Sequence, residues 1–366
     1  MKNLLAKYHI DFSLSDSNQL KAICILLIIA HNYFHCLEPL IGENEMVFGQ
    51  YNFSNFLSAL QQTPYDLFRP FFSFFGHYGV HIFIFLSGYG LTKKCLNREI
   101  TEFASLYRVS LGQIFKLVKL TLVGFVFLLL FQWVVWGDSN WLGYLKGYGE
   151  FLTFSQNLRP DRIFSLVSVW WFLCLIVQFY LVFPLLFRLA TESQRAFIVL
   201  SVLAIFASII LYKPLLAQKI YVYATPLGHL AVFALGMHFA LGRGIPRWAI
   251  VGALVIFPFS LIYEAFFHLS FVSVVLLSIA LYDRYKERIQ NVSVLHFIGG
   301  LSMFLYIVHG DMRKPFLHWL SQMSHAGVAE SYWIFVAFVI SVFIAALACQ
   351  KISAALGLFG KGKGKS

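Results

Sequence analysis

The chain has 366 residues, of which 59% are hydrophobic and only 12% are charged, and its formal net charge is +11. A soluble domain carries about 25% charged residues, so this composition excludes an ordinary soluble protein. The 40 phenylalanines and 8 tryptophans are typical of lipid-facing and interfacial surfaces. The sequence therefore predicts an all-α, polytopic membrane protein. Its positive charge suits loops that face anionic lipid, and we expect no nucleic-acid partner.

Ten apolar segments approach the length of about 20 residues that a transmembrane helix needs. The first begins near residue 20 and has no small-residue cleavage site after it, which favours a retained helix over a signal peptide. We expect one transmembrane domain over residues 1–366, ending in a short basic tail at 351–366. The ten segments are residues 20–37, 70–92, 113–136, 167–189, 195–212, 225–242, 247–264, 267–283, 295–312 and 331–350.

Loop charges predict how these segments cross the membrane. With the N-terminus in the cytoplasm, twenty of the 28 lysines and arginines fall on the inner side and eight on the outer side. This excess follows the positive-inside rule. Because ten is even, both termini are expected in the cytoplasm. The predicted location is the cell's inner or plasma membrane.

Histidines lie deep in three of the segments. His31 and His35 are four residues apart in the first segment, so they share one face of a helix. The second segment repeats this spacing with His77 and His81, and the ninth carries His309 at a similar depth. Ionisable side chains at membrane depth are costly and usually mark a function. These five residues are therefore candidates for a functional site.

Imidazole groups at this depth fit two kinds of chemistry. One is proton transfer, since an imidazole titrates near neutrality and can deprotonate a substrate hydroxyl. The other is metal binding, but Glu38 is the only acidic residue near the cluster in the sequence, so we expect no metal. The plain alternative is a set of histidines that are hydrogen-bonded between packed helices.

Basic residues gather at the cytoplasmic ends of the first three segments. Lys116 and Lys119 share a helix face, and Arg108 precedes them. Lys21 starts the first segment, about 15 Å below His31 by helical rise. Such a cluster could hold the phosphates of an anionic cofactor. Ordinary positive-inside anchoring is the alternative.

Several segments, taken together and in order, resemble the integral-membrane acyltransferase 3 family. The family opens with a basic residue, a long apolar run and a histidine, and it carries further motifs on its second, third, fourth and late helices. The matching parts of this chain are Lys21 to His31, residues 79–89 (GVHIFIFLSGY), Lys116-Leu-Val-Lys119, residues 171–184 (WFLCLIVQFYLVFP) and residues 301–309 (LSMFLYIVH).

The chain departs from the family pattern in three places. The spacing from Lys21 to His31 is one residue shorter than usual, which leaves the two side chains about 80° apart around the helix. His35 lies closer to the face of Lys21, so either histidine could be the base. Ile176 stands where the family has a glutamate, and the two lysines of the third segment replace arginines, turning bidentate phosphate forks into point charges.

The resemblance implies a membrane O-acyltransferase that moves an acyl group, usually acetyl, from acetyl-CoA to a hydroxyl of an envelope carbohydrate or lipid-linked glycan. The base would be His31 or His35. The CoA phosphates would meet Lys21, Lys116, Lys119 and Arg108. The substrate pocket would include His77, His81, Ser87, Trp171, Gln178 and His309.

Two other functions stay open from the sequence. A glycolipid or polysaccharide transporter, or a flippase, would use a similar cavity without chemistry. A metal-dependent membrane enzyme would use the histidines as ligands. Membrane lipids are expected partners in every case, and the sequence leaves the acceptor and the oligomeric state open.

Overall fold

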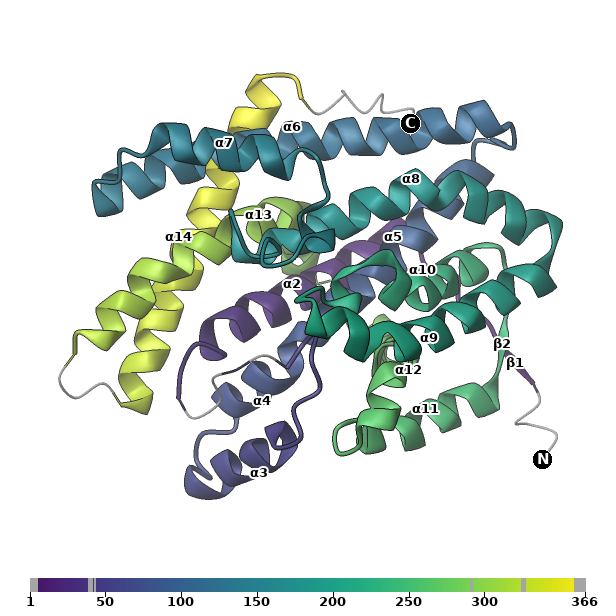
Figure 1. Cartoon of the computed structure of the whole chain (residues 1–366), viewed down its shortest axis with the longest axis horizontal. Coiled ribbons are helices and arrows are strands. Elements are labelled where there is room, and N and C mark those ends of the chain that lie inside the picture. The colour runs from purple at the N-terminus through teal and green to yellow at the C-terminus, as the bar shows by residue number, and fades with distance from the viewer. Residues whose placement is uncertain (1–5, 39–41, 43, 290–291, 324–326, 359–366) are drawn as a thin grey trace.

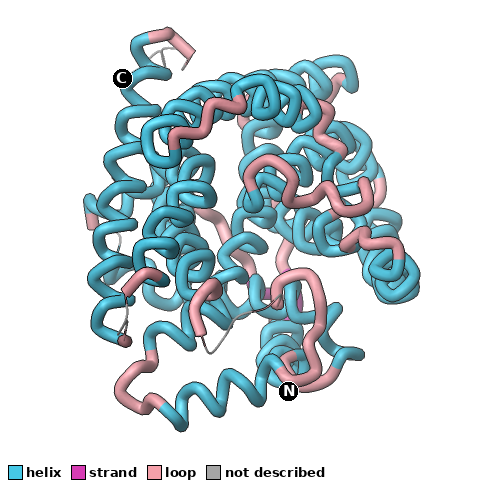
Figure 2. The backbone as a smooth tube through the Cα atoms, turned by 60° about the vertical axis from the view of Figure 1, so that its left-hand side comes forward, coloured by secondary structure: helices cyan, strands magenta, loops and turns pink. Residues whose placement is uncertain are grey.

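The computed structural model describes residues 6–38, 42, 44–289, 292–323 and 327–358. Helices make up almost all of this part of the chain (Figures 1 and 2). Two short strands, β1 (Lys7–Tyr8) and β2 (Ile245–Pro246), pair antiparallel beside the N-terminal segment. The predicted basic tail falls partly on residues 359–366, which lie outside the described residues.

Each of the ten predicted segments coincides with a helix, which confirms an all-α architecture. Seven helices in the described part are long and apolar enough to cross a membrane, and two apolar helices, α10 and α11, are shorter. The total of ten crossings and the side of the termini stay predictions. The helices are α2 (Leu14–Phe34), α4 with α5 (Phe68–Phe75 and Gly79–Leu96), α6 (Phe103–Trp136), α8 (Trp171–Glu192), α9 (Gln194–Ala217), α10 (Pro226–Ala240), α11 (Arg247–Ser260), α12 (Glu264–Ile289), α13 (Ser293–Ser321) and α14 (Val328–Ala355).

Several helices begin earlier than the apolar pattern predicts. α2 begins at Leu14 because Ser13 and Asp16 form a capping box: each side chain accepts a hydrogen bond from the other residue's backbone N–H. α6 begins at Phe103, ten residues before the predicted start, and its first turns mix apolar residues with the polar Ser105, Arg108 and Ser110. An apolar window does not detect such partly polar ends. It also misses the short helices α3 (Asn52–Gln62) and α7 (Trp141–Phe151); α7 packs beside α6 at the top of Figure 1.

A 3-10 turn, η1 (Gly76–Tyr78), interrupts the second predicted segment between α4 and α5. The break lies against α2. A Cβ atom at Gly76 would lie 2.6 Å from both the carbonyl oxygen of Leu27 and the Cβ of His31, so a side chain there would force the two elements apart. The glycine thus lets η1 and the start of α5 approach the C-terminal half of α2.

α2 is packed on several sides. It runs along α13 and also contacts α4, η1 and α5. A Cβ atom at Gly299 of α13 would lie 2.0 Å from the carbonyl oxygen of Asn18, so the two backbones meet directly, as small residues allow between membrane helices. α2 therefore holds Lys21 and His31 in fixed places between its neighbours.

Candidate active site

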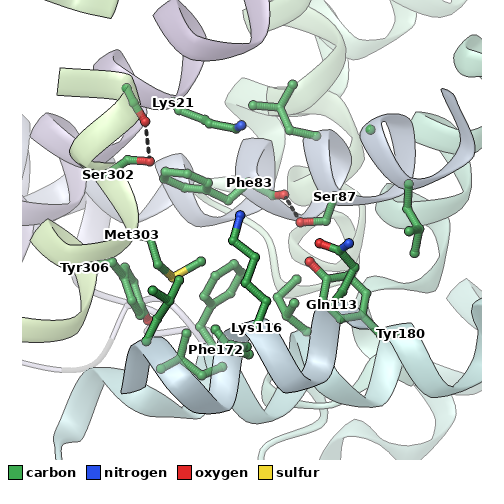
Figure 3. A pocket seen from close by; sticks show the side chains of 18 of the residues that line it. Lys21, Phe83, Ser87, Gln113, Lys116, Phe172, Tyr180, Ser302, Met303 and Tyr306 are labelled. Carbon is green, nitrogen blue, oxygen red and sulfur yellow. Dashed lines mark hydrogen bonds between the residues drawn. The ribbon is translucent and has the colours of Figure 1, made fainter. Parts of the chain in front are cut away.

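A cavity of about 370 Å³ lies between α2, α5, α6, α8 and α13. Three lysines line it: Lys21 from α2, Lys94 from α5 and Lys116 from α6. Lys21 and Lys116 reach into it from opposite sides (Figure 3). Lys116 interacts electrostatically with both of the other lysines. No aspartate or glutamate is among the described residues that line the cavity, so its field is positive and favours an anionic ligand.

The rest of the cavity wall is mostly apolar and aromatic. Phe83, Phe172 and Tyr306 lie on one side of it, and Ser87 with Tyr180 lies on another (Figure 3). The hydroxyl of Ser87 donates to the carbonyl of Phe83 at 2.8 Å, so its hydrogen is already used within α5. The arrangement suits a ligand with an anionic head and a slender, less polar arm.

His31 is buried farther along α2. Its Nδ1 lies 2.9 Å from the carbonyl oxygen of Ser73 in α4. A carbonyl can only accept, so Nδ1 carries the hydrogen and Nε2 of the neutral ring keeps its lone pair. The ring of His35 stacks on that of His31 with 4.8 Å between centroids. His31 therefore has a fixed tautomer with one basic nitrogen.

Three more imidazoles continue from His31 into the bundle. His77 of η1 lies 5.3 Å from it between ring centroids. His81 of α5 follows at 6.3 Å from His77, and His229 of α10 at 5.0 Å from His81. The rings meet edge to face rather than around one point, and the described residues contain no group of three or more His, Cys, Asp or Glu that could hold a metal ion.

The family model of the acyltransferase 3 family, described as an acyltransferase domain, matches residues 14–350. The chain belongs to the acyltransferase 3 family. Comparison with curated proteins and with solved structures gives no match. The family match begins with α2 and ends within α14, so it covers nearly the whole helical bundle. This acyltransferase is a multi-pass membrane protein.

The structure divides the predicted site residues of this acyltransferase into two groups and leaves others apart. Lys21, Lys116 and Ser87 line the cavity, and His31, His35, His77 and His81 lie beside one another near the C-terminal end of α2. The residues that belong to neither group are Lys119, Arg108, Trp171, Gln178 and His309.

Two members of this last set have clear partners elsewhere. The Gln178 side chain donates to the carbonyl of Phe154 at 2.7 Å and exchanges hydrogen bonds with Asn157, so it fastens the segment between α7 and α8. Nδ1 of His309 donates within α13, to the carbonyl of Tyr306 at 2.9 Å. The motif positions are present, and both side chains form these hydrogen bonds outside the two groups.

The site residues predicted from the sequence do not include Lys94, His229 or Arg313. The Arg313 guanidinium donates to both the backbone and the side-chain oxygen of Asn32, each at 2.8 Å, and to Ser168 at 3.3 Å. It therefore fastens the end of α2, next to His31. One signal could have found it: Arg313 follows His309 by four residues, on the same helix face.

Proposed function

We propose that this membrane acyltransferase moves an acyl group, acetyl in the first instance, from acyl-CoA to a hydroxyl of an envelope carbohydrate or lipid-linked glycan. One observation carries the proposal: three lysines and, among the described lining residues, no carboxylate line the cavity. One of these lysines, Lys21, lies on the same helix as His31. Phosphate oxygens form strong, charge-assisted hydrogen bonds with ammonium groups. The family match supports acyl transfer as the reaction.

The separation of the two groups fits a long donor. Lys21 and His31 are ten residues apart on α2, which is about 15 Å of helical rise. CoA carries its phosphates at one end and its thioester at the end of the pantetheine arm. With the phosphates at the lysines, the arm passes between α2 and α5, and the thioester reaches the outer half of α2.

The chemistry then needs a base and a fixed acceptor. Nε2 of His31 takes the proton of the acceptor hydroxyl as its oxygen attacks the thioester carbon. The C–O bond forms, the C–S bond breaks, and the electron pair leaves with the CoA thiolate. Arg313 and Ser73 hold the end of α2 and the His31 ring in place, which keeps the base in one geometry.

The proposal places the protein in the plasma membrane with ten crossings and both termini in the cytoplasm, so that CoA enters at the lysine end. The acceptor enters from the opposite side. Membrane lipids surround the bundle, and the many exposed apolar side chains of α6, α9 and α14 suit that contact.

The direct test uses membranes that contain the protein and acetyl-CoA labelled in its acetyl group. We expect label to enter the envelope glycan fraction of the host only when the protein is present. A transporter or flippase would leave acetyl-CoA unconsumed, so intact donor together with protein-dependent glycolipid movement would replace the enzyme proposal by the transport one.

A further inference from the structure

A continuous row of polar rings leads away from His31 through the bundle. We name His35, His31, His77, His81 and His229 the imidazole row. Successive ring centroids are 4.8, 5.3, 6.3 and 5.0 Å apart. The row joins three parts of the chain that are far apart in the sequence: the end of α2, the consecutive elements η1 and α5, and α10. The proposed acyl transfer uses His31 and leaves the other members without a role.

The row contains buried nitrogens that have no hydrogen-bond partner among the described residues. They are both ring nitrogens of His77 and the Nδ1 atoms of His35, His81 and His229. His77 is 3% exposed, and His81 and His229 are each 1% exposed. Burying an unpaired polar group costs about 1–3 kcal/mol. Several in one row are more than packing needs, and chains of histidines inside membrane proteins commonly carry protons.

Beyond the buried far end of the row, Tyr223 and His268 lead toward the surface. Nε2 of His229 donates to the carbonyl oxygen of Tyr223 at 2.6 Å, and the two rings lie 6.0 Å apart. The Tyr223 hydroxyl is hydrogen-bonded to Nδ1 of His268. His268 interacts electrostatically with Glu264, whose carboxylate pairs with Lys213 at 3.0 Å. Glu264 begins α12 and its side chain is 36% exposed. The path that continues from the row through Tyr223 and His268 therefore ends beside an accessible carboxylate.

We propose that the imidazole row is a proton relay that carries the hydroxyl proton from His31 through His77, His81 and His229 to the surface at His268 and Glu264. This inference rests on the proposed function. In each turnover the acceptor O–H bond breaks, His31 takes the proton, and the C–O bond forms as the C–S bond breaks. The proton then leaves through the row, and the CoA thiolate, released near His31, takes up one proton from the solution as CoA departs.

The charged groups beside the row fit this direction. The guanidinium of Arg313 interacts with His35, next to His31 where the relay starts, so it repels a proton at that end of the row. Glu264 attracts a proton at the other end, although Lys213 offsets part of its charge. Among the described residues, the titratable groups that interact with His77 and His81 are other histidines of the row. No carboxylate among these groups would trap the proton as it passes.

The test replaces relay imidazoles by rings that cannot carry a proton. His81 stacks on Phe271 at 4.5 Å and 11°, so His81→Phe keeps the aromatic contact, and His229→Phe does the same on α10. The matched control is His238→Phe, which changes another buried histidine of α10 that lies outside the row. Membranes with each variant receive labelled acetyl-CoA, and the measurements are label in envelope glycan, acetyl-CoA binding and the rate ratio in H₂O and D₂O.

We expect both relay variants to lower turnover on the order of 10²-fold with unchanged acetyl-CoA binding, a larger solvent isotope effect, and partial recovery of His81→Ala by added imidazole. The control should resemble the wild type. Wild-type turnover in both relay variants would overturn the relay. So would a loss with no isotope effect and no imidazole recovery, or a loss of acetyl-CoA binding, because these show a packing role. A wild type that transfers no label would instead refute the proposed function, and the relay with it.

Discussion

Nδ1 of His31 donates a hydrogen bond to the carbonyl oxygen of Ser73, across a distance of 2.9 Å. The two residues belong to α2 and α4, which meet only because η1 brings the second apolar segment against α2. The contact decides the tautomer of His31 and thereby which nitrogen is basic. We propose His31 rather than His35 as the base, a choice that the spacing from Lys21 leaves open.

The first prediction separates these two histidines. His31→Gln should lower turnover by about 10²–10⁴-fold because the general base is lost, while acetyl-CoA binding is kept. His35→Gln should have a smaller effect, since this ring stacks on the proposed base and hydrogen-bonds to the backbone of Ser73, and so supports the base. Label transfer and donor binding are measured for both variants. Near-normal acylation in both would remove the general-base mechanism and favour a transporter.

The second prediction concerns the lysines of α6. Lys116 lines the cavity and Lys119 does not, so the pair gives a matched comparison on one helix. Lys116→Ala should weaken acetyl-CoA binding by about 1.5 kcal/mol, roughly tenfold, for one charge-assisted contact. Lys119→Ala should bind acetyl-CoA normally. Acetyl-pantetheine, which lacks the nucleotide, should be unaffected by either change; equal losses for both donors would assign the lysines to folding or topology.

The third prediction concerns the clamp between Arg313 and Asn32. Nη1 of Arg313 donates to both oxygens of Asn32 and Nη2 donates to Ser168, and Arg313→Lys keeps the charge but loses this two-nitrogen geometry. We expect lower turnover with acetyl-CoA binding retained, because the lysine cavity is untouched. A double-mutant cycle with Asn32→Ala measures the coupling in turnover and in thermal stability. Additive effects of the two changes would show that the clamp does not position α2.

The fourth prediction concerns pH. The ammonium of Lys93 and then the hydroxyl of Tyr89 hydrogen-bond to Asp11, and they lower the pKa of this carboxyl. A lowered pKa stabilises the fold above the unfolded value of about 4, and the contribution is lost as pH falls through the folded value. The Asp11 side chain is 80% exposed, so the effect is small. Asp11→Asn should flatten the acid side of a plot of melting temperature against pH; an unchanged plot would contradict this contribution.

The fifth prediction concerns topology. Positive-inside counting places the residues after α14 in the cytoplasm. A reporter that works only outside the cell, fused after Ser366, should therefore stay silent. Strong activity of this reporter would exclude an even number of crossings with a cytoplasmic N-terminus. The same reporter fused in the segment between α13 and α14 is the positive control, since that loop is expected outside.

Much of the fold follows from local patterns, whereas the site follows from them only in part. Apolar length predicts where the ten helices lie, and the four-residue spacing picks out His77 and His81 because helix faces are a local property. His229 stands alone in a short apolar helix, so no spacing marks it. Gln178 matches a family motif, yet its partners in the segment after α7 are set by tertiary packing. Lys94 reads as an ordinary anchoring charge, because a cavity between five helices has no signature in any one of them.

The lysine cavity has a consequence for the end of the catalytic cycle. In the proposed function its lysines bind the phosphates, and these are the same in acyl-CoA and in free CoA. Interactions shared by donor and product add affinity without lowering the barrier to acyl transfer. Free CoA should therefore bind the cavity about as tightly as the donor does and compete with it. Release of free CoA from the cavity should then limit steady-state turnover. The cell's ratio of acylated to free CoA would then set the rate of acylation more directly than the donor concentration alone.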